Sequence, residues 1–150
     1  MKLANIETLN VFKYNHRVLH LNLEGITHED SIISPTNGAG CINWMLGHIV
    51  LSRDEAHRLI GLPGFSDKKY IELYDRGTRG NHVENPFQLN EIVKLFDESQ
   101  DTLNENIEIF DFSGDTKKLD KLTFYAFHES YHIGQIGILR RFIGKEGAIK

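Results

Sequence analysis

Hydrophobic residues recur at helical spacing in four segments of the chain, and stretches rich in glycine and proline separate these segments. The first covers residues 5–23, the second residues 41–60 and the last residues 117–143. The third opens with a cap, Asn85, and a first-turn proline, Pro86. No segment alternates convincingly as a strand does, and no internal repeat is present. The pattern predicts an all-α fold, and specifically a four-helix bundle.

The third segment has the most regular pattern of the four. Its apolar positions alternate steps of four and three residues, which is typical of the seam between packed helices. One polar residue, Gln100, interrupts this seam, and such a glutamine either fixes the register of the helices or faces water and a ligand. The seam consists of Leu89, Val93, Phe96, Gln100, Leu103, Ile107 and Phe110.

Two long connections separate these helices. Residues 25–40 contain closely spaced helix breakers and are expected to be a loop. Residues 61–85 form a polar connection of 25 residues between the second and third helices. A connection of this length is usually a crossover or a functional cover, and we expect a short turn of helix within it, around residues 70–74. The two helices that it joins therefore need not be antiparallel neighbours.

Composition narrows the class of protein. With 150 residues, 40% of them hydrophobic and 25% charged, the chain is expected to be one globular domain over residues 1–150. A net charge of −4 gives no electrostatic reason to expect nucleic acid or an anionic membrane as a partner. The single cysteine, Cys41, excludes an internal disulfide and is expected to be an inert packed thiol. Without a leader or a run of 18 apolar residues, a cytoplasmic location is expected.

The histidines of the second and fourth helices are the main candidates for chemistry. His128 and His132 are four residues apart, so both project from the same face of the last helix. Aromatic and aliphatic residues, Phe124 and Tyr131 among them, share that face, which predicts that the two rings lie in a buried stripe. His48 occupies the middle of the apolar stripe of the second helix. Three imidazoles can bind one divalent ion and leave coordination positions open, so we predict His48, His128 and His132 as metal ligands.

Other polar and aromatic residues are candidates for lining such a site. His16 interrupts the apolar stripe of the first helix, where it is either a core histidine with satisfied nitrogens or a supporting residue near the site. On the second helix, Asp54 and His57 point away from His48 and are expected at the surface. The candidate lining residues are His16, Trp44, Ser52, Gln100, Tyr125 and Gln135.

Glu129 allows two other metal chemistries to be considered. The run from His128 to His132 matches the HExxH signature of metalloproteases, but no histidine follows among the last 18 residues to supply a third ligand. A di-iron carboxylate site would require Asp54 and His57 to face inward. We favour neither of these sites. Glu129 either hydrogen-bonds a ligand or a bound water from the edge of the site, or is a buried or interfacial carboxylate with a structural partner.

Small residues line the back of the last helix. Ala126, Ser130 and Gly134 recur every four residues, with Gly137 beside them. Glycines inside a helix cost about 1 kcal/mol each relative to alanine, so a compensating close approach of another helix is expected. That helix is either a neighbour in the same bundle or a partner in a dimer, and we expect a homodimer.

Two stretches resemble the signature segments of the DinB/YfiT superfamily. They are NWMLGHI, residues 43–49, and HESYHIGQI, residues 128–136. The first helix with its Tyr14-Asn15, the chain length and the long link after the second helix agree with this resemblance. The resemblance implies an up-down-down-up bundle, often dimeric. It also implies one divalent metal, commonly nickel or zinc, bound by residues that match His48, His128 and His132.

The resemblance also suggests a class of reaction. Relatives include transferases that use a low-molecular-weight thiol such as bacillithiol or mycothiol, although many members have no known reaction. We therefore hypothesise a metal-dependent enzyme that acts on a small molecule by thiol S-transfer or by a related addition or hydrolysis. The alternative is a non-catalytic metal-binding or stress-responsive bundle protein. Nothing in the sequence distinguishes nickel or zinc from iron or manganese.

Overall fold

The computed structural model describes residues 2–35, 38–78, 80 and 84–149, and all regular secondary structure in that part of the chain is helical. The all-α prediction is confirmed. The helices in order are α1 Lys2–Leu23, α2 His28–Ser31, α3 Ile42–Leu59, α4 Lys68–Tyr74, α5 Leu89–Asn106 and α6 Thr116–Phe142.

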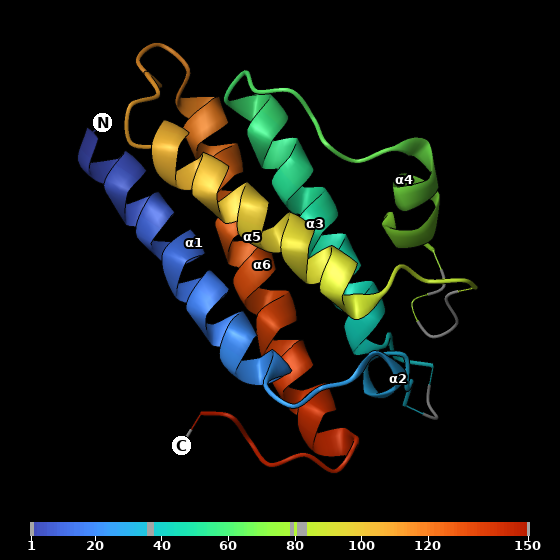
Figure 1. The fold of residues 1–150 in the computed structure, drawn as a ribbon. Coiled ribbons are helices and arrows are strands. Elements are labelled where there is room, and N and C mark those ends of the chain that lie inside the picture. Colours follow the sequence, from blue (N-terminus) through green and yellow to red (C-terminus); the bar gives the residue numbers. More distant parts are fainter. Residues whose placement is uncertain (1, 36–37, 79, 81–83, 150) are drawn as a thin grey trace.

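The four long helices α1, α3, α5 and α6 lie side by side along most of their lengths (Figure 1). α1 packs on α6 and α5, and α3 packs on α6 and α5 from the other side. In the view of Figure 1, α1 and α6 run from top to bottom, whereas α3 and α5 run from bottom to top. The long helices α3 and α5 thus point the same way. The segment between them, which contains α4, returns the chain along the outside of α3.

Local capping explains where several helices begin. Cys41 is the N-cap of α3, and its Sγ accepts a hydrogen bond from the Trp44 backbone N–H. α5 begins at Leu89, because the Gln88 backbone N–H is bonded by the Glu91 carboxylate at 2.9 Å. The predicted start at Asn85 and Pro86 is therefore wrong, and Asn85 instead adopts a positive φ of 50°.

The loop expected over residues 25–40 contains one short helix. Thr27 and Asp30 form a reciprocal capping box at the start of α2, with hydrogen bonds of 3.1 Å in both directions. The turn of helix expected around residues 70–74 is present as α4. The sequence indicates α2 only through this capping box, and the glycines and proline that follow it favour a loop.

Tyr74 fixes the crossover segment to the body of the protein. Its hydroxyl donates to the Asn43 side-chain oxygen at 2.9 Å and accepts from the Phe87 backbone N–H at 3.1 Å. Its ring lies directly against Gly47 of α3, where any Cβ would overlap the ring. Gly47 therefore allows α4 to approach α3 closely, and this approach sets the position of the Tyr74 backbone beside His48.

The buried face of α6 differs from the one predicted. Its buried residues are Leu122, Ala126, Glu129, Ile133, Ile136 and Leu139. Phe124 and Tyr131, which were expected in the buried stripe, are 54% and 57% exposed. His128 and His132 consequently lie at the edge between the core and the surface, with intermediate exposure.

Helix α1 covers the small residues of α6. Asn15 donates to the Ala126 carbonyl at 3.0 Å and accepts a hydrogen bond from Ser130 Oγ at 2.8 Å. Gly137 lies next to the side chain of Asn22. The close approach predicted from the small residues is therefore made within the chain at Ala126, Ser130 and Gly137, but not at Gly134, where an added Cβ would meet nothing within 4 Å. Within the described residues, no helix has the length and apolar composition needed to cross a membrane.

Candidate metal centre

Three imidazoles from two helices converge on one point. His48 of α3 lies with its Nε2 at 3.3 Å from Nε2 of His128, and Nε2 of His132 lies at 3.1 Å from the same atom. The three rings meet edge to face, with centroids 4.5–5.1 Å apart. The two rings of α6 come together because their positions are one turn apart, and α3 packs against α6 at that level.

The outer nitrogen of each ring has a partner that determines where its proton lies. Nδ1 of His48 faces the Tyr74 carbonyl at 2.9 Å and must donate to it. Nδ1 of His132 faces the side-chain oxygen of Gln135 at 2.7 Å. Nδ1 of His128 lies 3.2 Å from the Ser52 hydroxyl, whose own proton is donated to the His48 carbonyl. Nδ1 of His48 and Nδ1 of His132 therefore act as donors, and Nδ1 of His128 can donate to the Ser52 hydroxyl in the same way.

When His128 also carries its proton on Nδ1, three Nε2 lone pairs face one another. In that tautomer the contacts of 3.1 and 3.3 Å among these nitrogens have no hydrogen to share, whereas a His128 protonated on Nε2 donates along one of them. Nitrogens that bind zinc at 2.0–2.1 Å in a tetrahedral arrangement are separated by about 3.3 Å. The observed separations match that spacing. The group His48, His128 and His132 can hold a divalent metal ion.

The surroundings also favour the neutral form of two of these rings, those of His128 and His132. Burial, reinforced by the neighbouring rings of His132 and His48, lowers the pKa of His128 to about 4. Burial likewise lowers the pKa of His132, although its hydrogen bond with Gln135 acts in the opposite direction. Because metals bind the unprotonated imidazole, lowered pKa values keep the site available at neutral and mildly acidic pH.

Trp44 supports His48 from one side. The two rings stack nearly in parallel, with centroids 5.0 Å apart and an interplanar angle of 6°. The indole N–H donates to the Thr78 hydroxyl at 2.8 Å, which fixes the orientation of the indole. His48 is therefore held by a carbonyl at one edge and by an aromatic plane on one face.

A cleft of about 440 Å³ opens beside the three histidines. Its walls are mainly aromatic, and among the described residues that line it Arg76 is the one charged side chain apart from the histidines. Ser52 and Tyr125, both predicted to line the site, lie in this wall. The described residues that line the cleft are Trp44, His48, Ser52, Arg76, Phe124, Tyr125, His128, Tyr131 and His132.

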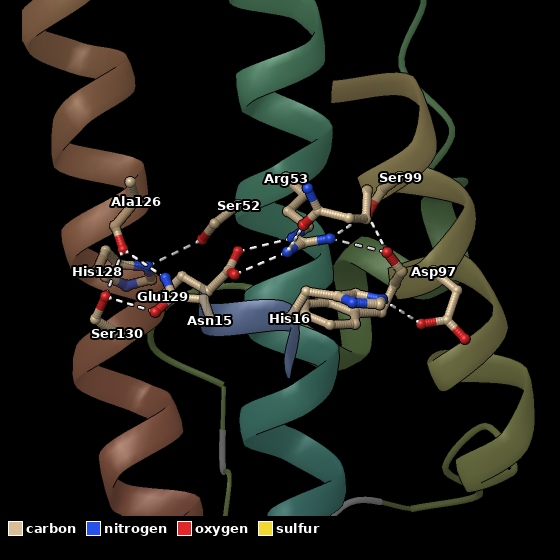
Figure 2. A network of polar contacts seen from close by, with 12 residues as sticks. Asn15, His16, Ser52, Arg53, Asp97, Ser99, Ala126, His128, Glu129 and Ser130 are labelled. Atoms are coloured by element: carbon tan, nitrogen blue, oxygen red, sulfur yellow. Dashed lines mark hydrogen bonds and ion pairs between the residues drawn. The ribbon is translucent and has the colours of Figure 1, made fainter. Parts of the chain in front are cut away.

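Glu129 lies on the buried side of α6 and is bound by Arg53 (Figure 2). Arg53 Nε and Nη2 contact the two carboxylate oxygens at 2.7 and 2.8 Å, and both side chains are 1% exposed. This bidentate pair engages both carboxylate oxygens. In this structure, Glu129 therefore has a buried structural partner and faces away from the ligand nitrogens.

Arg53 makes further contacts that use its remaining N–H groups. They reach the Phe96 carbonyl at 2.9 Å, Ser99 Oγ at 3.0 Å and the Gln100 side-chain oxygen at 2.8 Å. The guanidinium also lies 3.6 Å from the ring centroid of Phe96. Gln100 thus belongs to this arginine network and not to the cleft. Helical periodicity did not indicate Arg53, because its partners come from two other helices.

Two residues expected at the surface of α3 are buried. Asp54 and His57 are 2% and 4% exposed, so that prediction is wrong. The segment after α3 folds back over Asp54, whose carboxylate accepts backbone hydrogen bonds from Phe65 and Ser66. His57 faces the Ser99 carbonyl of α5 at 3.3 Å. α3 is enclosed on nearly all sides, which a two-sided helical pattern does not show.

His16 lies apart from the three convergent histidines. Its Nε2 lies 2.8 Å from Oδ1 of Asp97 on α5, and Nε2 of His20 lies 2.7 Å from the same oxygen. His16 is therefore not a wall of the cleft described above. His20 and Asp97 were not indicated by the sequence pattern, since one is exposed and the other lies outside the apolar seam of α5.

Comparison of the chain with protein-family models, with curated proteins and with solved structures gives no significant match. The geometry of the site is therefore the basis for a functional hypothesis.

Proposed function

We propose that the chain is a divalent-metal-dependent enzyme of the DinB/YfiT type that acts on a small molecule, by thiol S-transfer or by a related addition or hydrolysis. The observation that carries this proposal is the convergence of three Nε2 atoms, with contacts of 3.1 and 3.3 Å, and a hydrogen-bond partner for Nδ1 on the far side of each ring. His48, His128 and His132 are the proposed ligands.

Nickel and zinc are the metals that we propose first, since imidazole nitrogens suit both, while iron and manganese remain to be tested. A bound divalent ion supplies Lewis acidity that polarises an electrophile or lowers the pKa of a thiol or water. Three protein ligands leave room for a substrate, as in reactive metal sites. The cleft beside the histidines gives a small molecule access to that position.

The walls of the cleft favour a particular kind of substrate. Arg76 offers a positive charge suited to a carboxylate, and Trp44 and Tyr125 offer apolar surface. Among the described residues that line the cleft there is no carboxylate, and both oxygens of Glu129 are engaged by Arg53. This lining favours a substrate that brings its own nucleophile. An acidic low-molecular-weight thiol meets these requirements.

Three further parts of the proposal concern the whole chain. The directions of α1, α3, α5 and α6 in Figure 1 support an up-down-down-up four-helix bundle with α4 in the crossover. A single buried cysteine supports a reducing compartment, the cytoplasm. Exposed apolar side chains on α6 support a homodimer formed through that helix. These side chains are Phe124, Phe127, Tyr131, Ile138 and Phe142.

The second candidate is a metal-binding bundle without catalytic activity, in which the ion serves folding or sensing. That no carboxylate is found among the described residues of the cleft lining favours this candidate as well. Under this hypothesis, removal of the metal lowers the melting temperature, and no thiol substrate is turned over.

One experiment separates the two candidates. The chain, purified without a histidine tag, is analysed for bound metal and then assayed with a small acidic thiol and an electrophile. Metal-dependent turnover that disappears in His48→Ala, and persists in the control His28→Gln outside the cleft, supports the enzyme. Metal binding without turnover for a panel of thiols supports the second candidate. Failure of the wild-type protein to bind zinc or nickel contradicts both.

A further inference from the structure

We propose a second divalent-cation site, formed by His16 and His20 of α1 and Asp97 of α5. Both Nε2 atoms point at one carboxylate oxygen, with distances of 2.8 Å from His16 and 2.7 Å from His20. The three potential ligand atoms all lie within 4.8 Å of one another. Two imidazoles and one carboxylate are a ligand set that zinc and other borderline divalent ions use.

The local structure presents these side chains to one point. His16 and His20 are one helical turn apart, so their rings emerge from the same face of α1 and lie with centroids 4.7 Å apart. The His16 ring stacks on the buried Phe96, with centroids 5.3 Å apart and an interplanar angle of 11°. Asp97 follows Phe96 directly in α5. The same aromatic residue therefore positions the first histidine and anchors the helix segment that carries the carboxylate.

An ion can enter with small movements. Cis ligands at 2.0–2.1 Å from an ion are separated by about 2.9–3.3 Å, so the His–Asp distances of 2.7 and 2.8 Å need to lengthen by only a few tenths of an ångström. The two Nε2 atoms lie within 4.8 Å of each other and release their protons when both bind the ion. The side chains are 30% exposed for His16 and 42% exposed for His20 and Asp97. This exposure gives an ion a path from solvent and leaves positions open for water or a small ligand.

The space next to His20 supports such a ligand. A hollow of about 630 Å³ lies between the end of α1 and the start of α5, and His20 forms part of its lining. The polar residues that share this lining are Arg17, Glu24 and Asn90. The proposed ion would therefore lie at the margin of a hollow that solvent can fill.

This site is separate from the three-histidine site. The ligands come from α1 and α5, whereas His48 and the pair on α6 come from the other two long helices. Figure 2 shows His16 and Asp97 on the opposite side of Arg53 from His128. Between the two sites, the guanidinium of Arg53 lies against one aromatic ring, Phe96, which also stacks on His16. Binding at one site can thus be measured without the ligands of the other.

Zinc titration of the untagged, chelator-stripped protein tests this proposal. Two zinc ions per chain are expected in the wild type. Asp97→Asn keeps the shape of the side chain but removes its charge, and His20→Gln keeps a polar group but removes the imidazole. Each variant should bind one zinc with wild-type affinity, and the second at least about tenfold more weakly, since even loss of an outer partner of a metal ligand costs 10–100-fold. Asp101→Asn, one turn further along α5 and exposed, is the matched control and should bind two.

A second set of variants distinguishes this site from the three-histidine site. The double variant His48→Ala/His128→Ala should retain one zinc, and that zinc should be lost when Asp97→Asn is added. Retention of helicity by circular dichroism is checked for every variant. A wild-type protein that binds one zinc, lost in the double variant and unchanged in Asp97→Asn and His20→Gln, overturns the second site alone. A wild-type protein that binds one zinc, retained in the double variant and lost in Asp97→Asn and His20→Gln, supports the second site and contradicts the proposed three-histidine site.

Discussion

Arg53 of α3 binds both carboxylate oxygens of Glu129 on α6, and Glu129 directly follows the metal-ligand candidate His128 in the sequence. The pair ties α3 to α6 at the level where their histidines meet (Figure 2). Because both side chains are 1% exposed, removing one of them leaves a buried charge without a partner. The two helices that carry the ligands are therefore fixed relative to each other by a contact that does not involve the ligands.

This contact gives the first prediction, on stability. Glu129→Leu should lower the free energy of unfolding by about 3–5 kcal/mol, because the Arg53 guanidinium stays buried and unpaired. The double variant Arg53→Met/Glu129→Leu should recover most of that loss. Urea unfolding at neutral pH with a chelator present measures both values. If the free energy of unfolding of Glu129→Leu lay within about 1 kcal/mol of the wild-type value, as expected for an exposed ion pair, the prediction would be contradicted.

The second prediction concerns the outer partner of His128. Ser52→Ala removes the hydroxyl that accepts the Nδ1 proton of His128, so the ring loses the contact that directs its other nitrogen toward the ion. The affinity for zinc or nickel should fall by about 10–100-fold, as measured by competition with a coloured chelator. Ser130→Ala is a control on α6 that contacts Asn15 and no histidine. Equal metal affinities for the two variants would mean that Ser52 does not orient His128.

The third prediction compares two glycines in α3 and α6. In Gly47→Ala the new methyl group overlaps the Tyr74 ring, so the variant should lose about 1–3 kcal/mol of stability and bind metal less tightly, since Tyr74 also holds His48. In Gly134→Ala the methyl group meets nothing within 4 Å. That variant should gain up to about 1 kcal/mol from helix propensity. Thermal unfolding and metal titration of both variants give the comparison, and equal effects would argue against a close contact at Gly47.

The fourth prediction is a pH dependence that arises from His57. Burial lowers the pKa of His57 below the ordinary value of 6.5. As the pH falls below 6.5, the unfolded chain takes up this proton while the folded protein resists it, so stability is lost with falling pH. The glutamine in His57→Gln cannot titrate. The stability of this variant relative to the wild type should therefore rise as the pH falls from 7 to 5. Urea unfolding of the metal-free proteins measures this difference.

His128 and His132 do not obscure that comparison. Their lowered pKa values act in the same direction, but both residues are present in the wild type and in His57→Gln. The difference between the two proteins therefore isolates the contribution of His57. Parallel pH profiles would show that the imidazole is not kept neutral by burial.

The fifth prediction tests the proposed homodimer. Ile138 on α6 is 70% exposed and lies among the exposed apolar residues of that helix. Ile138→Glu should convert the dimer to a monomer, because a charge would be buried at the interface without a partner. Ile109→Glu, at a residue that is 78% exposed and lies outside α6, should leave the dimer intact. Light scattering coupled to size-exclusion chromatography gives the mass, and a wild type that is monomeric at all concentrations contradicts the proposal.

Helical periodicity was sufficient to predict the all-α fold and the approximate positions of the long helices, although α5 begins at Leu89 and not at Asn85. The spacing of His128 and His132 and the central place of His48 are local patterns, and the structure brings these three residues together. The pattern placed His128 and His132 too deep, since it weighed the aromatic residues Phe124 and Tyr131 as buried although both are exposed.

Contacts between residues that are far apart in the sequence could not be predicted from helical periodicity. Asp54 is buried because the chain after α3 returns over it, and no feature near Asp54 predicts that return. His16 and His20 are joined to Asp97 across 81 and 77 residues. Single-helix periodicity also cannot detect Arg53, whose partners lie on α5 and α6. These pairings depend on which helices are neighbours, which is a property of the packing.

Trp44 is the only tryptophan of the chain, and its indole lies parallel to the imidazole of His48. Its intrinsic fluorescence therefore comes from a single position next to the proposed ligands, without a label. Nickel bound there should quench the emission, whereas the closed-shell zinc ion should mainly shift it. The protein carries its own optical probe of ligand-site occupancy.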